Sequence, residues 1–269
     1  MIKSAIIHRI VRRPSRTVLR SAATALLLAA VSGTALAQQQ AAPEAERDAR
    51  AIAALSAMGK YLRTLKEFRV RSETSKDEVL ENGQKLQFSG SVDYRVRQPD
   101  RLRAEVKNDI GHRLFFYDGA TLTQYAPRLG YYAIVKTPAT IAATLRQASE
   151  KFDLEVPLAD LFFWGSEQSG IEDIREASVI AASSINGVAC DHYAFRQDDV
   201  DWQIWITRGA KPLPLKLVIT TKDEPSQPQF TALFKWETQP KFDQATFAFT
   251  PPKGAKKIEA VDYSSAAAK

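Results

Sequence analysis

Two spacings of hydrophobic residues divide the chain. Between residues 45 and 66 the apolar side chains recur three or four positions apart, as on one face of an α-helix. The members of this stripe are Ile52, Leu55, Met58, Leu62 and Leu65. Over residues 86–96 the spacing changes to two, with apolar and polar residues in alternation. The sequence therefore predicts an amphipathic helix followed by a half-buried antiparallel strand.

Tight-turn dipeptides separate further short strands. Asn-Gly or Asp-Gly pairs, which accept the positive φ of hairpin turns, occur at residues 82–83, 118–119 and 186–187. Further strands are predicted over residues 102–106, 114–117, 121–125, 131–136, 188–196, 202–207, 215–221 and 230–237. Gly90, an inward position without a side chain, indicates a bend or bulge. So many short strands in succession predict a large curled sheet or a barrel.

Residues 137–165 interrupt the strand pattern with a helical insertion. Thr137 and Pro138 are typical of a helix cap and a first helical position, and apolar residues at helical spacing follow. A second short helix is predicted over residues 157–164. Its apolar side chains either form a lid over a cavity or pack as a plain core helix. These side chains are Leu158, Leu161, Phe162 and Trp164.

The N-terminal residues have the pattern of an export signal. The first 20 residues contain six basic and no acidic side chains, and an apolar run over residues 22–31 follows. That run is shorter than the roughly 20 residues of a transmembrane helix. Ala35-Leu36-Ala37 then supplies the small residues that a signal peptidase needs. We predict a cleavable signal peptide over residues 1–37, a flexible lead-in over residues 38–47, and a periplasmic protein without a stable membrane anchor.

Removal of the signal peptide changes the charge of the protein. The whole chain has 37 basic and 31 acidic residues and a net charge of +6. Because the signal peptide takes away six basic and no acidic residues, the mature chain is expected to be near neutral, and no nucleic-acid partner is expected. The lone Cys190 excludes an internal disulfide. We predict one domain over residues 48–260 and a disordered tail over residues 261–269.

Motifs for catalysis are missing from the sequence. No G-x-S-x-G elbow or P-loop is present, and His112 and His192 are the only histidines after residue 37. A hydrolase is therefore the least expected function. Cys190 and His192 face the same side of a predicted strand, but two ligands are too few for a closed zinc site. We expect no catalytic residue, no metal and no cofactor.

Two charged groups offer weaker candidate sites. Asp198, Asp199 and Asp201 can be interpreted as calcium ligands, or more simply as a solvated hairpin tip. Four arginines alternate with apolar residues and should lie on the outer face of two paired strands. They form either a groove for an anionic group or the wet face of a sheet. These arginines are Arg95, Arg97, Arg101 and Arg103.

Three stretches, in this order, resemble the LolA-like family of periplasmic lipoprotein carriers. They are the opening helix that leads into residues 68–74, the group YRVRQPDRLR (94–103) with YDGATL (117–122) and YAP (125–127), and the ending FAFTPPKG (247–254). The resemblance implies a mainly β, α+β fold. Its sheet is a strongly curved, half-open antiparallel barrel, closed by the N-terminal helix and the insertion over an apolar cavity.

One position departs from the family pattern. The lipoprotein carriers have a basic residue directly before the proline of the second stretch, and here that residue is Gln98. Arg97 precedes it and lies on the other face of the strand if the strand is regular. The chain is therefore expected to be a relative of the lipoprotein carriers rather than a carrier of that kind.

Eight aromatic residues form the candidate ligand site. They are predicted to project inward from a sheet that the helices cover only in part, and either line an apolar cavity or fill the interior. They are Phe88, Tyr94, Phe116, Tyr125, Tyr131, Trp202, Phe234 and Trp236. The leading hypothesis is a monomeric, non-enzymatic periplasmic protein that binds a lipid or the acyl chains of a lipoprotein. The alternative is an interaction or sensor module with a filled core and an envelope protein as partner.

Overall fold

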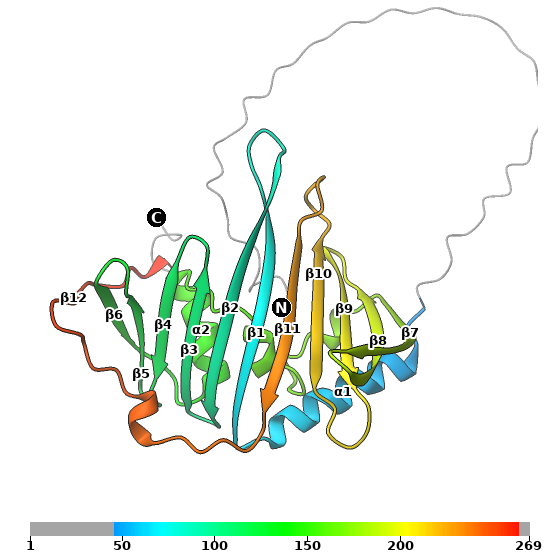
Figure 1. Ribbon diagram of the computed structural model, residues 1–269, viewed down its shortest axis with the longest axis horizontal. Helices are drawn as coiled ribbons and strands as arrows, with labels where there is room; N and C mark the ends of the chain where they lie inside the picture. The colour runs from blue at the N-terminus through cyan, green and yellow to red at the C-terminus, as the bar shows by residue number, and fades with distance from the viewer. Residues whose placement is uncertain (1–45, 264–269) are drawn as a thin grey trace, which may run out of the picture.

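A computed structural model describes residues 46–263, in which one curved antiparallel sheet of 12 strands holds the helices on its inner side (Figure 1). The helices are α1 (Ala49–Thr64) and α2 (Ile141–Phe152), with short 3₁₀ turns η1 (Ala159–Phe162), η2 (Ile171–Asp173) and η3 (Gln244–Phe247). The strands are β1 (Glu67–Val79), β2 (Lys85–Arg97), β3 (Arg101–Asn108), β4 (His112–Tyr117), β5 (Thr121–Ala126), β6 (Tyr131–Lys136), β7 (Glu176–Ile185), β8 (Val188–Arg196), β9 (Val200–Thr207), β10 (Pro214–Thr221), β11 (Gln229–Glu237) and β12 (Lys256–Lys257).

The sheet is curved and open, so the predicted curved, half-open sheet is confirmed but its description as a barrel is not supported. Its strand order is β12-β6-β5-β4-β3-β2-β1-β11-β10-β9-β8-β7, and the two edge strands do not pair with each other. Short segments cover part of each edge instead. The parallel strand β12 pairs with β6, and Arg47 forms a parallel bridge with Ala177 at the start of β7. α1 follows this bridge and runs along the β7–β10 end of the sheet (Figure 1).

Both ends of the chain extend beyond the described residues. The predicted signal peptide over residues 1–37 lies outside them, as do most of the lead-in and residues 264–269 of the tail. Within the described part, the Asp48 amide donates to the Ala177 carbonyl at 2.9 Å and the Ala177 amide donates to the Glu46 carbonyl at 3.1 Å. The last residues of the predicted lead-in are therefore hydrogen-bonded to β7. No helix among residues 46–263 is long and apolar enough to span a bilayer.

α1 confirms the predicted amphipathic helix. Asp48 caps it by accepting a hydrogen bond from the Arg50 amide at 2.8 Å, and Leu55, Met58 and Leu62 are buried. Gly59 lies on the same buried face. The backbone of Gly165 passes directly over it, so that a Cβ added at Gly59 would lie 2.4 Å from the Gly165 nitrogen. The contact brings α1 and the chain after η1 together at backbone distance.

The strands follow the predicted period of two, with two differences. β7 was not predicted, and its ladder with β8 is interrupted by a register shift between Val179 and Ala181. Gly90 was expected to mark a bend or bulge, but it pairs regularly with Thr74 and Asn108. A Cβ at Gly90 would lie 2.8 Å from the Lys107 carbonyl oxygen. The glycine therefore permits a close approach of the strands rather than a bulge.

The insertion begins later than its sequence predicts. The cap of α2 is Thr140, whose hydroxyl accepts from the Ala143 amide at 3.3 Å, and not Thr137. Three residues, 137–139, separate the end of β6 from this cap. The predicted short helix over residues 157–164 is reduced to the 3₁₀ turn η1, because Leu158 has a left-handed φ of 64° that ends helical geometry on its N-terminal side.

Arg97 fastens the C-terminal stretch to the outer face of the sheet. Its Nε donates to Glu67 Oε1 at 2.6 Å, its Nη1 donates to Gln244 Oε1 at 3.2 Å, and its Nη2 donates to the Phe242 carbonyl. The guanidinium also lies 5.2 Å from the centroid of the Phe247 ring. The expected position of Arg97 on the outer face is confirmed, and one side chain ties β1, β2 and η3 together.

Substitution of Arg97 by glutamine should loosen η3. We expect a loss of about 1–2 kcal/mol in unfolding free energy, since several charge-assisted hydrogen bonds of a half-exposed side chain are removed. Amide hydrogen exchange over residues 244–248 should accelerate. The matched control is Arg101→Gln, because Arg101 pairs with Arg97 across the strands but bonds to its own neighbour Asp100. Equal exchange rates in the two variants would contradict the fastening role.

Candidate functional site

The centre of the interior is filled by the insertion. Phe162 stacks on Phe68 with ring centroids 6.4 Å apart and meets Tyr94 edge-on at 5.4 Å. The Tyr94 hydroxyl donates to the Pro157 carbonyl. All four residues predicted to form a lid are buried here: Leu158, Leu161, Phe162 and Trp164. In this part of the molecule the side chains agree with the filled-core interpretation.

Six of the eight predicted cavity aromatics lie on the inner face. Tyr94, Trp202 and Phe234 are buried, and Trp202 stacks on Phe195 at 4.3 Å. Trp236 is half-buried and donates through Nε1 to the Pro214 carbonyl at 2.7 Å. The fifth and sixth are Phe88, which is half-buried, and Tyr131, which is 41% exposed beside β12. Most of this set is therefore core rather than lining.

Phe116 and Tyr125 were assigned to the wrong face. Both side chains lie on the outer face, where their rings are 5.3 and 5.5 Å from the ring of Phe249. Phe115 and Tyr117 are the inward residues of β4. Because three aromatic residues follow one another in β4, its sequence does not show which of them point inward. The stretch around Phe249 also makes part of the outer face apolar.

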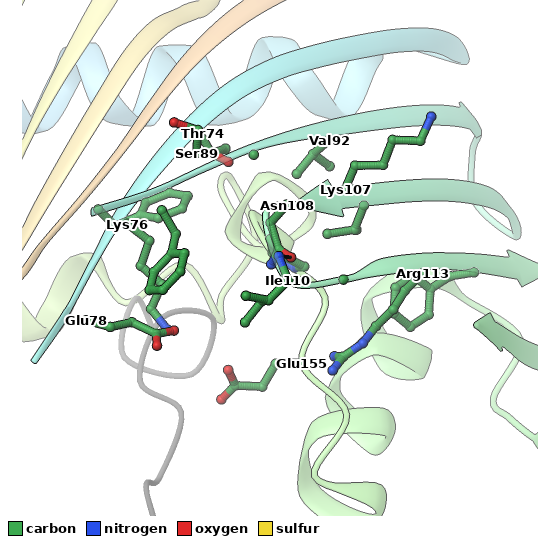
Figure 2. Close-up of a pocket in the computed structure, with 17 residues that line it drawn as sticks. Thr74, Lys76, Glu78, Ser89, Val92, Lys107, Asn108, Ile110, Arg113 and Glu155 are labelled. Atoms are coloured by element: carbon green, nitrogen blue, oxygen red, sulfur yellow. Dashed lines mark hydrogen bonds and ion pairs between the residues drawn. The ribbon is translucent and has the colours of Figure 1, made fainter. Parts of the chain in front are cut away.

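An apolar pocket of about 280 Å³ lies at the end of the inner face nearest the β1–β2 hairpin tip (Figure 2). We name it the end pocket. β1 to β4, β11 and the chain after α2 enclose it, and its apolar lining is Phe88, Val92, Val106, Ile110, Phe115, Pro157 and Phe230. Phe88 is the one member that the sequence placed in a ligand site. The insertion both contributes Pro157 to this pocket and, through Phe162, covers Phe68 and Tyr94 further along the inner face.

Five charged side chains line the end pocket, and four of them form its rim: Lys76, Glu78, Arg113 and Glu155; the fifth is Lys107. Lys76 Nζ lies 3.5 Å from Glu78 Oε1 on the same strand. Arg113 is exposed, and within residues 46–263 its guanidinium forms no hydrogen bond or ion pair. Figure 2 shows the Arg113 and Glu155 side chains directed toward the opening, whereas Lys107 points away. Lys107 is bound to Glu105 at 2.6 Å.

A second pocket of about 230 Å³ lies between α2 and η1 and contains a buried acid. Asp160 is 6% exposed, and burial raises the pKa of its carboxyl group to about 7. Arg146, Glu150 and Glu155 line the same pocket. The sequence signal for this site is one acidic residue inside the apolar run ADLFFW, and sequence reasoning passed over it.

The predicted arginine row lies on the outer face, as expected. Arg95 and Arg103 pair across β2 and β3, and Arg103 stacks on Phe116 at 5.2 Å. Burial, and then the charge of Arg95, lower the pKa of Arg103. Arg69 binds Asp93 on the same face, with Nε to Oδ1 at 2.9 Å. Because the row is engaged with groups of the protein itself, the geometry favours a wet sheet face over an anion-binding groove.

The candidate metal ligands do not converge. No group of three histidine, cysteine or acidic side chains suited to a metal ion occurs between residues 46 and 263. Cys190 is buried, while His192 stacks on Trp205 at 4.0 Å. Arginines bind the acidic hairpin tip, since Arg175 contacts Asp198 at 3.0 Å and Arg196 contacts Asp201 at 2.9 Å. The solvated-tip interpretation is favoured over calcium binding.

An open, curved antiparallel sheet packed around a helix and a helical insertion is the LolA-like architecture that the sequence resemblance implies. The chain belongs to the family described as predicted periplasmic protein (DUF2092), which it matches over residues 51–261. A comparison with curated proteins gave no match.

Several solved structures have a similar arrangement. LprF from Mycobacterium bovis is 11% identical over 78% of this chain and 100% of its own, with a TM-score of 0.44. The Mycobacterium tuberculosis lipoprotein LppX is 10% identical over 72% and 98%, with a TM-score of 0.45. A LolA superfamily protein from Nitrosomonas europaea is 10% identical over 74% and 97%, with a TM-score of 0.35. These scores describe a distant likeness of shape.

Proposed function

We propose that the protein is a periplasmic, non-enzymatic binding protein that takes one acyl chain, from a lipid or an acylated protein, into the end pocket. The observation that carries this proposal is an apolar lining behind a charged rim. The volume of about 280 Å³ is close to the lower limit of small-molecule pockets, about 300 Å³, which favours one chain over several. Each buried CH₂ group would contribute about 0.8 kcal/mol, so binding needs no covalent step.

Filling the end pocket should abolish acyl binding. Val106 is half-buried and faces the pocket from β3, and Val106→Phe would place a phenyl ring in the space that the chain occupies. We expect at least a tenfold rise in the dissociation constant of a fluorescent fatty-acid probe, equivalent to about 1.4 kcal/mol. Leu129→Phe is the control, because Leu129 is 71% exposed in the β5–β6 turn, outside the pocket.

The same titration separates the two hypotheses for this fold. Wild-type protein that takes up no acyl probe would contradict the binding function. The interaction or sensor module would then be the remaining hypothesis, and the filled centre of the interior supports it. If Val106→Phe and Leu129→Phe reduced probe binding equally, the probe would bind outside the end pocket. Circular dichroism spectra of all three proteins should agree, since Val106 is only half-buried and Leu129 is exposed.

A further inference from the structure

The rim of the end pocket carries both signs of charge. β1 contributes Lys76 and Glu78, β4 contributes Arg113, and the chain after α2 contributes Glu155. Two cations and two carboxylates therefore surround the opening of one apolar pocket. Resting on the acyl-binding function proposed above, we propose that the ligand is a single-chain amphiphile with a zwitterionic headgroup. Arg113 binds its anionic group, and the negative charge of the rim carboxylates attracts its cationic group.

Arg113 is the natural anchor for an anionic group. Its guanidinium points toward the opening in Figure 2 and is engaged with no group in residues 46–263. A guanidinium presents several N–H donors in one plane, which match two oxygens of a phosphate or carboxylate at once. The neighbouring cationic side chains are less available to an anionic group of a ligand. Lys76 is held by Glu78 at 3.5 Å, and Lys107 is turned away toward Glu105.

The carboxylates of the rim disfavour the binding of a purely anionic headgroup. A lipid with a net negative charge would gain Arg113 but would also bring its charge close to Glu78 and Glu155, and like charges at a binding site are costly. A purely cationic headgroup would meet the reverse problem at Arg113 and Lys76. A headgroup with one charge of each sign is attracted by the rim charges of opposite sign and leaves the net charge of the opening unchanged.

The apolar walls limit the rest of the ligand. Phe88, Val106 and Phe230 lie behind the rim and offer no polar partner to an inserted group. Ile110 is 66% exposed in the turn between β3 and β4 and extends the apolar wall at the opening. An acyl chain can therefore pass from the charged rim into the pocket along these apolar side chains.

Three ligands with the same acyl chain test this inference. Lysophosphatidylethanolamine is zwitterionic, lysophosphatidylglycerol is anionic and monoacylglycerol is uncharged. Each is titrated against the purified protein with a bound fluorescent fatty-acid probe. The zwitterion should displace the probe at a concentration at least tenfold lower than either of the others. In Arg113→Gln this advantage over monoacylglycerol should fall to within twofold, while monoacylglycerol itself binds unchanged. Arg128→Gln, an exposed arginine of the β5–β6 turn, serves as the matched control and should retain the advantage.

The outcomes against the inference are distinct. Equal displacement by all three ligands would overturn headgroup selection and leave acyl binding standing. Tightest binding of the anionic lipid would overturn the zwitterionic class. If Arg113→Gln weakened the binding of all three ligands equally, Arg113 would maintain the shape of the pocket and would not bind the headgroup. Failure of all three ligands and of the probe to bind wild-type protein would overturn the acyl-binding function itself, and the inference with it.

Discussion

Replacing Asp160 with asparagine should remove a loss of stability that the wild-type protein undergoes as the pH rises from about 4 to 7. The Asp160 carboxyl group is buried beside α2, and burial raises its pKa to about 7. In the unfolded chain the same group ionises near its ordinary pKa of 3.8. Between these values the folded state holds a proton that the unfolded state has lost, so unfolding becomes easier with each step in pH.

The expected effect is large enough for equilibrium unfolding. Between pH 5 and pH 8 the wild-type protein should lose roughly 3 kcal/mol relative to Asp160→Asn, because asparagine stays neutral throughout. Urea titrations followed by tryptophan fluorescence at the two pH values measure the difference directly, and contributions from other titrating groups cancel. Asp223→Asn, an exposed position between β10 and β11, is the control and should follow the wild type. Parallel pH profiles of wild type and Asp160→Asn would contradict the prediction.

Gly59→Ala should destabilise the protein although alanine is the better helix former. Helix propensity alone favours the substitution by about 1 kcal/mol. The added Cβ, however, would lie 2.4 Å from the Gly165 nitrogen and 2.7 Å from its Cα, and both atoms belong to the backbone. No side-chain rotation relieves that contact, so α1 must move away from the insertion. We expect a net loss of about 2–3 kcal/mol in unfolding free energy.

A helix substitution without the contact is the natural comparison. Ala57 is exposed on α1, and Ala57→Gly should cost about 1 kcal/mol through propensity alone. Gly59→Ala is the opposite substitution, from glycine to alanine. It should nevertheless lower the unfolding free energy measured in urea more than Ala57→Gly does. A Gly59→Ala protein as stable as wild type would show that α1 and the chain after η1 are not held at backbone distance.

The sequence predicts most strands because period and turn chemistry agree there. β2 has a clear alternation and is followed by further strands that Asn-Gly or Asp-Gly turns separate. β7 lacks that agreement. Its middle is Ala181, Ala182, Ser183 and Ser184, which have no strong apolar alternation, and a register shift lies beside Ile180. A small-residue edge strand with an interrupted register leaves little periodic signal.

The candidate site was less accessible to sequence reasoning because it depends on where elements meet. Phe88 could be assigned to the inner face from its own strand, but only the placement of the insertion decides that Phe88 lines space while Tyr94 is covered by Phe162. The face of Phe116 is set by its pairing with Arg103 on the neighbouring strand, and on that face it contacts Phe249, more than 100 residues away. Gly59 was detectable, since a glycine on the buried stripe of a helix commonly marks a close backbone approach.

The pairing of β1 with β11 has a consequence for how the chain acquires its fold. These two strands lie side by side at the centre of the sheet, although one opens the series of strands and the other comes after nearly all the rest. The strands from β2 to β6, and those from β7 to β10, pair with neighbours in sequence. The central ladder must close a loop of about 150 residues, and such long-range pairing slows folding. Each half can thus form hairpins early, but the joined sheet can form only once almost the whole chain, up to β11, is available to fold.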